Sequence, residues 1–211
     1  MKFHRAGPAV RIPYIYEPLP PGKTTRLINL KPAWNRAARL DFTLEAVNIQ
    51  STPTDLHIPY TAISYTWEGQ TPTRAVICDG KELLITANAE DALRRLRPRR
   101  DNETKRYFWI DAICINQSSV EDKNRQVTHM ASIYESAEKI AVWLGHVKGP
   151  ELLYWPAVAK LLRDEKVAER MKAARNDNAF VPGLSLLTTK RYWTRIWTIQ
   201  EIAGYLSKTK L

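Results

Sequence analysis

The sequence has few of the features that mark secreted, membrane-spanning or disulfide-stabilised proteins. Its 211 residues include only two cysteines, Cys78 and Cys114, and both lie in apolar, strand-like runs. Two buried, reduced thiols are the simplest interpretation, and they favour a reducing compartment. No apolar run reaches the ~20 residues that a transmembrane helix needs, and the N-terminus has no hydrophobic signal segment. We therefore expect a cytoplasmic protein with no membrane partner.

Signatures of metal, phosphate-loop and serine chemistry are also missing. The four histidines are scattered, without Cys-x-x-Cys or His-x-x-x-His spacing, so no metal site is predicted. Neither a Walker loop nor a Gly-x-Gly-x-x-Gly fingerprint is present. Cys114 with His129 is an alternative nucleophile pair, but the apolar run around Cys114 favours inert packing. Ser64 lacks the Gly-x-Ser-x-Gly elbow of a hydrolase nucleophile.

Positive charge is what the sequence has in excess. The formal net charge is +10. Much of it comes from a cluster at a predicted helix end and the following loop, which comprises Arg94, Arg95, Arg97, Arg99, Arg100, Lys105 and Arg106. Basic residues suit a helix C-terminus, and a solvated charge run is the simplest interpretation. The cluster would also attract nucleic acid or an anionic nucleotide. Because it lacks interleaved aromatic residues for base stacking, nucleic acid is disfavoured as a partner.

The order of predicted elements indicates an α/β fold. Residues 1–25 are rich in proline and basic residues and predict an extended arm, followed by a single domain over residues 26–211. Strands are predicted at residues 26–30, 41–49, 60–67, 74–78, 81–86, 107–115 and 139–144, and helices at about 88–98, 120–137, 151–174 and from 192 onward. Strand–helix alternation in the second half predicts a mainly parallel sheet flanked by helices. An N-terminal strand pair and an Asp79-Gly80 hairpin are additions to that plan.

Three segments join an apolar core to polar residues at the C-terminal end. They are Tyr60-Thr-Ala-Ile-Ser-Tyr-Thr-Trp67, Trp109-Ile-Asp-Ala-Ile-Cys-Ile-Asn-Gln117 and Arg195-Ile-Trp-Thr-Ile-Gln-Glu201. In open α/β sheets, ligands bind outside the carboxyl ends of the strands. The sequence therefore predicts one binding site built from Ser64, Tyr65, Trp67, Trp109, Asp111, Asn116, Gln117 and Trp197, with Glu201 as a candidate catalytic carboxylate.

Structural alternatives exist for the polar members of this set. Trp197 and Glu201 are four residues apart and share a helix face. There, Glu201 can orient a sugar hydroxyl or stabilise developing positive charge, or it can be a solvent-exposed residue paired with a lysine or arginine. Asp111 is either a polar wall of the site or a structural group that caps a helix or pairs with an arginine such as Arg125 or Arg195. The pair Asn116-Gln117 either binds a ligand or turns the chain into the next helix.

Taken together, the segments resemble the HET (heterokaryon incompatibility) domain of filamentous fungi. The resemblance covers residues 14–204 in three blocks. The first is Tyr60–Trp67, the second is Trp109–Gln117 with Arg125-Gln-Val127, Met130, Ile133-Tyr134, Ala137 and Val142-Trp-Leu-Gly145, and the third is Arg191–Glu201. Two departures stand out. Glu68 separates Trp67 from Gly69, and the chain stops soon after Glu201, so we expect either a short natural protein or a truncated one.

This resemblance implies a role in non-self recognition, in which fusion of incompatible fungal cells triggers programmed cell death. HET domains are in turn similar to TIR domains, which have a flavodoxin-like fold and some of which cleave NAD. The catalytic helix of TIR enzymes carries Trp-x-x-x-Glu, which Trp197–Glu201 fits, and Ser64-Tyr65 fits the pair beside their nucleotide. NAD or a related nucleotide would then be a substrate, with no cofactor required.

Two functions follow from the resemblance. One is cleavage of the nicotinamide N-glycosidic bond of NAD, with Trp67, Trp109 and Trp197 lining the pocket. The other is a non-enzymatic module that signals by self-association. In both cases we expect a homo-oligomer in the active state, and an upstream regulatory protein is a further expected partner.

Overall fold

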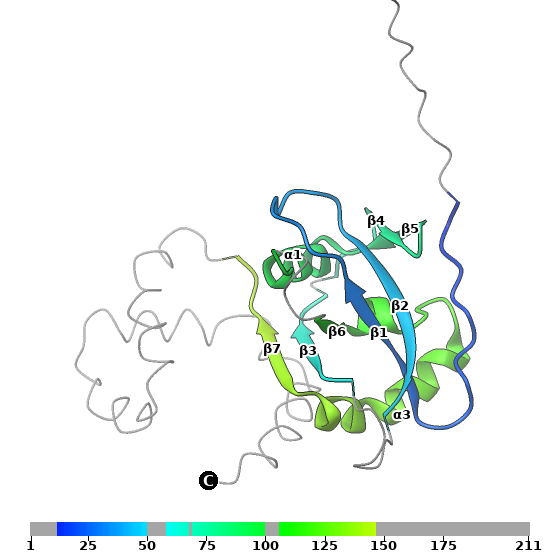
Figure 1. Ribbon diagram of the computed structural model, residues 1–211. Coiled ribbons are helices and arrows are strands. Elements are labelled where there is room, and N and C mark those ends of the chain that lie inside the picture. Colours follow the sequence, from blue (N-terminus) through cyan, green and yellow to red (C-terminus); the bar gives the residue numbers. More distant parts are fainter. Residues whose placement is uncertain (1–11, 50–57, 68, 100–105, 147–211) are drawn as a thin grey trace, which may run out of the picture. The chain divides into compact units, whose positions relative to one another are not determined.

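A computed structural model describes residues 12–49, 58–67, 69–99 and 106–146 of the chain (Figure 1). The chain divides into two compact units, residues 1–143 with 199–211 and residues 144–198. All of the described helices and strands belong to the first unit. The helices predicted at residues 151–174 and from 192 onward lie outside the described residues.

The described elements form one mixed sheet with three helices. In chain order they are β1 (Thr24–Leu30), β2 (Asp41–Asn48), β3 (Tyr60–Tyr65), β4 (Arg74–Cys78), β5 (Lys81–Ile85), α1 (Ala87–Leu96), β6 (Tyr107–Trp109), α2 (Asp111–Cys114), α3 (Val120–Ser136) and β7 (Lys139–Trp143). The seven strands follow the order β5-β4-β2-β1-β6-β3-β7. The predicted α/β class is therefore confirmed.

The prediction of a mainly parallel sheet is not confirmed. Parallel pairing joins β6 to β3 and β3 to β7, so β3 is the middle strand of a parallel group, as Figure 1 shows. However, antiparallel pairing extends over seven residues between β1 and β2 and over five between β4 and β5. The difference arises because the N-terminal strand pair is not an appendage. Strand β1 lies inside the sheet, antiparallel to both β2 and β6.

Local sequence signals explain why these elements begin and end where they do. The Thr86 side chain caps α1 by accepting a hydrogen bond from the Ala89 amide at 3.2 Å, and Ser119 caps α3 through the Asp122 amide at 3.1 Å. At the β4–β5 hairpin, Asp79 and Gly80 have φ angles of 49° and 75°. Two successive left-handed residues suit the turn whose twist matches the flanking strands.

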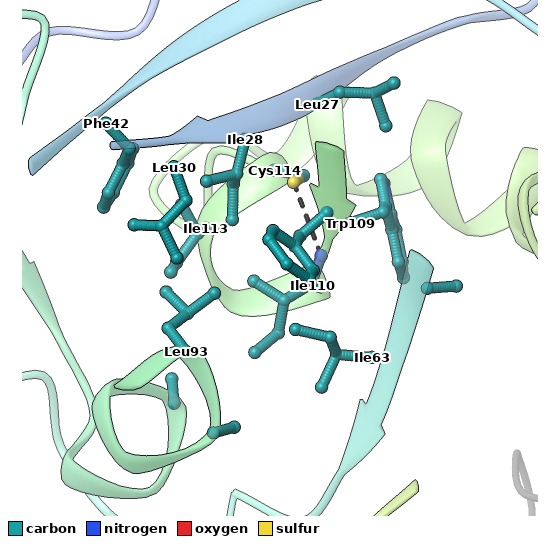
Figure 2. Close-up of a cluster of buried hydrophobic side chains, with 14 of the residues drawn as sticks. Leu27, Ile28, Leu30, Phe42, Ile63, Leu93, Trp109, Ile110, Ile113 and Cys114 are labelled. Atoms are coloured by element: carbon teal, nitrogen blue, oxygen red, sulfur yellow. Dashed lines mark hydrogen bonds between the residues drawn. The ribbon is translucent and has the colours of Figure 1, made fainter. Parts of the chain in front are cut away.

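The predicted strand over residues 107–115 is wrong in its second half. Strand β6 ends at Trp109, and the chain then makes the short helix α2. Within this turn the Ile110 amide donates to Cys114 Sγ at 3.4 Å (Figure 2). Both residues and Ile113 are fully buried. A continuous apolar run satisfies a buried strand and a buried helical turn equally, so periodicity could not separate them.

The hydrophobic core packs between the sheet and these helices. Figure 2 shows Ile28 and Leu30 of β1 and Phe42 of β2 on the side of Ile113 from α2, with Leu93 of α1 and Ile63 of β3 nearby, whereas Leu27 points away from them. Because these side chains are closely packed, the positions of the strand ends next to the core are fixed.

Part of the basic cluster is structural rather than solvated, which corrects the sequence-based interpretation. Arg94 donates to the carbonyl oxygens of Arg36 and Ala38 at 2.6 and 2.7 Å. Arg97 is only 6% exposed and donates to the carbonyls of Lys31, Ala38 and Arg39. These arginines hold the β1–β2 connection, because a buried carbonyl needs a donor wherever no strand supplies one.

Candidate functional site

The C-terminal ends of β3 and β6 are joined by a direct side-chain contact. Trp67 follows β3, and Asp111 follows β6 as the first residue of α2. The Trp67 Nε1–H donates to Asp111 Oδ2 at 3.1 Å, and Asp111 Oδ1 accepts a hydrogen bond from the Ala112 amide at 2.7 Å. The first two segments that the sequence assigned to one site therefore meet in the structure. Asp111 orients the Trp67 indole and also begins a helix.

Asn116 and Gln117 help to form the turn that follows α2, and they also face a pocket. The Gln117 side-chain amide donates to the Asp111 carbonyl at 2.9 Å. The Asn116 side-chain oxygen accepts a hydrogen bond from the Ser118 amide at 3.1 Å, which helps to turn the chain toward α3. Both residues also line the pocket described next.

A pocket of about 470 Å³ opens beside this contact. Trp67, Ala112, Asn116, Gln117 and Ser118 form the wall nearest the ends of β3 and β6. The opposite walls come from the N-terminal arm and from β5 with its flanking residues, namely Pro13, Tyr14, Ile15, Tyr16, Pro72, Glu82, Leu83, Leu84, Ile85 and Thr86. Ligand pockets commonly have volumes of roughly 300–1,000 Å³, so this one could hold a small organic molecule.

The arm is held along the edge strand β5 by backbone hydrogen bonds. The Tyr14 amide donates to the Glu82 carbonyl at 2.7 Å, and the Glu82 amide donates to the Ile12 carbonyl at 2.9 Å. Tyr16 reaches further, and its hydroxyl donates to the Ile113 carbonyl at 2.9 Å. The sequence analysis missed Tyr14 and Tyr16 as pocket residues. The alternation Tyr14-Ile15-Tyr16 after Pro13 was the available signal, because it is typical of a strand-like segment.

Arg26 ties the arm to the loop that carries Asn116. Its side chain is 5% exposed and donates to the Glu17 carbonyl at 2.7 Å, the Cys114 carbonyl at 3.0 Å and Asp122 Oδ2 at 3.0 Å. The same Asp122 oxygen accepts a hydrogen bond from the Asn116 amide at 2.7 Å. Arg26 therefore supports the pocket walls without lining the pocket.

Arg125, which the sequence offered as one partner for Asp111, holds the arm. It donates to the carbonyls of Leu19 at 3.1 Å and Gly22 at 2.9 Å, to the Pro20 carbonyl, and to Thr24 Oγ1 at 2.7 Å. Arginine suits this task because its planar head carries five N–H donors in a fixed geometry.

A second polar link joins the ends of β3 and β7. The Trp143 Nε1–H donates to Asn88 Oδ1 at 2.8 Å, and the Asn88 side-chain amide donates to the Thr66 carbonyl at 2.6 Å. The Asn88 backbone amide donates to Gln70 Oε1 at 2.9 Å. The sequence analysis used Asn88 only as a helix start, and nothing local to it indicated that its side chain would bridge two strand ends.

Ser64, Tyr65 and Trp109 are buried beneath this polar edge. Their exposed fractions are 1%, 1% and 0%. Ser64 and Tyr65 lie opposite Val142 and Trp143 in the β3–β7 register. The Trp109 indole donates to Thr25 Oγ1 at 3.0 Å, and its ring packs edge-on against Tyr134. The structure thus places Trp109 in the core, while Trp197 and Glu201 lie outside the described residues.

Burial makes both cysteine thiols harder to ionise. Burial raises the pKa of the Cys114 thiol to about 12, so it carries no thiolate near neutral pH. Burial, followed by the nearby Asp79 carboxylate, also raises the pKa of Cys78. These shifts argue against a Cys114–His129 nucleophile pair. Among the residues that the structure describes, no group of three His, Cys, Asp or Glu side chains could hold a metal ion. Within the same residues, no helix is both long and apolar enough to cross a membrane.

The fold and the site together define an α/β domain that gathers aromatic and amide side chains at the ends of neighbouring parallel strands. The family model for heterokaryon incompatibility proteins (HET) matches residues 60–201, and the chain belongs to this family. It is 35% identical over 136 residues to heterokaryon incompatibility protein 6, OR allele, of Neurospora crassa. That match covers 59% of this chain and 19% of the relative, so the chain spans about a fifth of the relative's length. No solved structure matches the chain.

Proposed function

We propose that this domain is a cell-death effector of fungal heterokaryon incompatibility and that it acts by cleaving NAD. Two findings support the biological role, namely membership of the HET family and the similarity to a Neurospora crassa incompatibility protein. The chemical part of the proposal draws on the site at the ends of β3 and β6 and on the Trp197–Glu201 pair of the sequence.

The proposed reaction breaks the bond between C1′ of the ribose and the pyridinium nitrogen of nicotinamide. The bonding electron pair leaves with nicotinamide, which becomes neutral. A water oxygen then bonds to C1′ and a proton is released, giving nicotinamide and ADP-ribose. Because the leaving group is already cationic, no general acid is needed, and one carboxylate can stabilise the oxocarbenium-like ribose. We assign that role to Glu201, and the spacing of four residues predicts that Trp197 shares its helix face.

The single observation that carries the proposal is the Trp67–Asp111 hydrogen bond at the edge of an aromatic pocket. The bond fixes the orientation of the Trp67 indole, which then offers a flat surface to a ligand ring. Aromatic faces attract cations with roughly 0.5–2 kcal/mol, depending on how far the contact excludes water. A pyridinium ring fits both the shape and the charge preference of such a wall.

The order of the parallel strands is consistent with a TIR-like arrangement. The chain runs from β3 to β6 on one side and then to β7 on the other, which leaves β3 in the middle. Flavodoxin-like sheets begin with this order, and their ligands bind where the connections diverge. We propose that β6-β3-β7 corresponds to the start of such a sheet, with β1 and the hairpin as additions.

The test is NAD consumption by the purified chain at high protein concentration with a crowding agent. Glu201→Gln and Glu201→Ala are compared with Glu135→Gln, a matched change at an exposed position on α3. We expect release of nicotinamide by the wild type and by Glu135→Gln, and none by the folded Glu201 variants. Turnover that survives both Glu201 changes would contradict the assignment of the carboxylate, and absence of any turnover would contradict the enzymatic proposal.

A second candidate function, signalling by self-association, is favoured by one surface feature. Val120 and Val127 are one heptad apart on α3, and they are 68% and 45% exposed. Two apolar side chains on the same solvent-facing stripe suit helix–helix contact between copies. If this stripe forms an interface, Val127→Glu should convert a concentration-dependent oligomer into a monomer in sedimentation velocity. An unchanged mass distribution would exclude the stripe as the contact.

A further inference from the structure

Four residues that line the pocket precede the family match, namely Pro13, Tyr14, Ile15 and Tyr16. The HET match begins at Tyr60, whereas Tyr14 and Tyr16 belong to the N-terminal arm. Their rings contact each other edge-on, with centroids 5.0 Å apart. Together with Trp67, three aromatic side chains line one pocket. Planar ligand rings bind well between aromatic side chains because stacking removes two apolar faces from water.

The arm is fixed in place independently of any ligand. Its backbone pairs with Glu82 on β5, the Tyr16 hydroxyl bonds to the Ile113 carbonyl, and the Arg26 side chain donates to the Glu17 carbonyl. The Arg26 guanidinium also lies 5.2 Å from the centre of the Tyr16 ring. A wall that is already ordered loses little conformational entropy when a ligand arrives, so even a small ring can bind measurably.

The charge of the lining differs sharply from that of the whole chain. The chain has 32 lysine and arginine residues and a formal net charge of +10, yet none of the described residues that line this pocket is a lysine or arginine. Among the described lining residues, the charged one is Glu82, whose carboxylate pairs with Arg39 at 3.1 Å. Phosphate and carboxylate groups are bound by basic side chains or by converging backbone N–H groups. An anionic group placed in this pocket would lose water and gain no cationic partner.

We infer that the arm, β5 and Trp67 form a subsite for a planar aromatic ring that carries no negative charge, with Tyr14 as a ring-binding residue. This inference rests on the proposed function for the identity of its natural ligand, the nicotinamide end of NAD. The pyrophosphate would then lie outside the pocket. The subsite discriminates by ring charge, because its described lining holds no basic group that could compensate an anion.

Three small aromatic ligands of nearly equal size test directly whether the subsite discriminates by ring charge. They are 1-methylnicotinamide, which is cationic, nicotinamide, which is neutral, and nicotinate, which is anionic. Binding to the whole chain is measured by calorimetry or by ligand-observed NMR. We expect the cationic and neutral rings to bind and nicotinate to bind at least about tenfold more weakly, the factor that ~1.4 kcal/mol produces. Equal binding of nicotinate, or binding of none of the rings at millimolar concentration, would overturn the inference.

Matched variants locate the binding within the pocket. Tyr14→Phe keeps the ring and should bind nicotinamide like the wild type, whereas Tyr14→Leu should bind it roughly tenfold more weakly, as expected for loss of one stacking partner. Ser118→Lys adds a cation at the pocket wall and should strengthen nicotinate binding. Thr128→Lys adds the same charge on α3 outside the lining and should not. Equal effects of the two lysines, or of the two Tyr14 changes, would overturn the subsite.

The experiment separates the subsite from the proposed reaction. If the rings bind as expected but the chain never cleaves NAD, the subsite stands and the enzymatic proposal fails. If NAD is cleaved and Tyr14→Leu leaves KM and kcat unchanged, the subsite is wrong and the enzymatic proposal stands. Glu201→Gln should abolish cleavage while leaving nicotinamide binding intact, because we assign ring binding to Tyr14 and Trp67 and the carboxylate role to Glu201.

Discussion

Replacing Arg26 with leucine is expected to lower the free energy of unfolding by about 3–5 kcal/mol, the usual cost of removing one partner of a buried ion pair. The Arg26 and Asp122 side chains are 5% and 12% exposed, and Arg26 Nη1 lies 3.0 Å from Asp122 Oδ2. The substitution also leaves the Glu17 and Cys114 carbonyls without this donor. Each lost hydrogen bond to a charged group is worth about 1.5–3 kcal/mol. These losses are not additive, so the expected decrease in the free energy of unfolding remains about 3–5 kcal/mol, the value for the ion pair alone.

Urea unfolding followed by far-ultraviolet circular dichroism measures this difference. Arg26→Leu is compared with Asp122→Leu and with the double variant. Because the single changes leave an uncompensated charge or unpaired acceptors, the double variant should lose less stability than the two single losses added together. The exposed pair Lys31–Asp41, with side chains 59% and 35% exposed, is the control. Solvent screens that pair, so Lys31→Leu should change stability by about 1 kcal/mol or less.

Two outcomes would refute this reasoning about Arg26. One is a loss below about 1 kcal/mol for Arg26→Leu, which would place the contact in the range of exposed pairs. The other is strict additivity in the double variant, which would mean that Arg26 and Asp122 act independently. Either result would remove the main physical argument that the arm is held firmly against the α2–α3 connection.

Two further predictions concern the site edge and the pH dependence of stability. Trp67→Phe removes the donor to Asp111 Oδ2, so it should cost about 1–2 kcal/mol in urea unfolding, and an unchanged stability would contradict the bond. Burial raises the pKa of Cys114 from 9.0 to about 12, so the unfolded thiol ionises first and stability should fall as pH rises from 9 toward 12. Cys114→Ala should make that fall shallower in thermal unfolding, and an identical slope would contradict the assignment.

Sequence alone predicted the elements whose signals are local. The Asp79-Gly80 turn and the helices predicted at about 88–98 and 120–137 depend on patterns over a few residues, and they are found as the β4–β5 hairpin, α1 and α3. The position of β1 was not predictable in this way. Its place between β2 and β6 depends on pairing with residues 12 to 80 positions away, and the pattern within β1 does not specify those partners.

The candidate site was predicted in part for the same reason. Trp67, Asp111, Asn116 and Gln117 follow strands, and the rule that strand ends meet at one edge was enough to group them. The rule does not tell which residues near a strand end are accessible and which are buried in the core. Trp109 is buried, and the sequence could not predict this because a shift of one residue along a strand moves a side chain to the other face of the sheet.

The arm and α1 supplied what sequence reasoning missed. Tyr14 and Tyr16 reach the pocket only because the arm pairs with β5, and Asn88 reaches Thr66 only because α1 starts beside the end of β3. Both arrangements are long-range, and no pattern within the arm or the helix specifies the partner.

The measurement that tests the central claim most directly is made in fungal cells that express the chain. Cell death and cellular NAD are followed together after induction for the wild type, Glu201→Gln and Glu135→Gln, at equal protein abundance. The account predicts NAD loss before death for the wild type and the Glu135 control, and neither for Glu201→Gln. Death at the wild-type rate in cells with Glu201→Gln and undiminished NAD would contradict it.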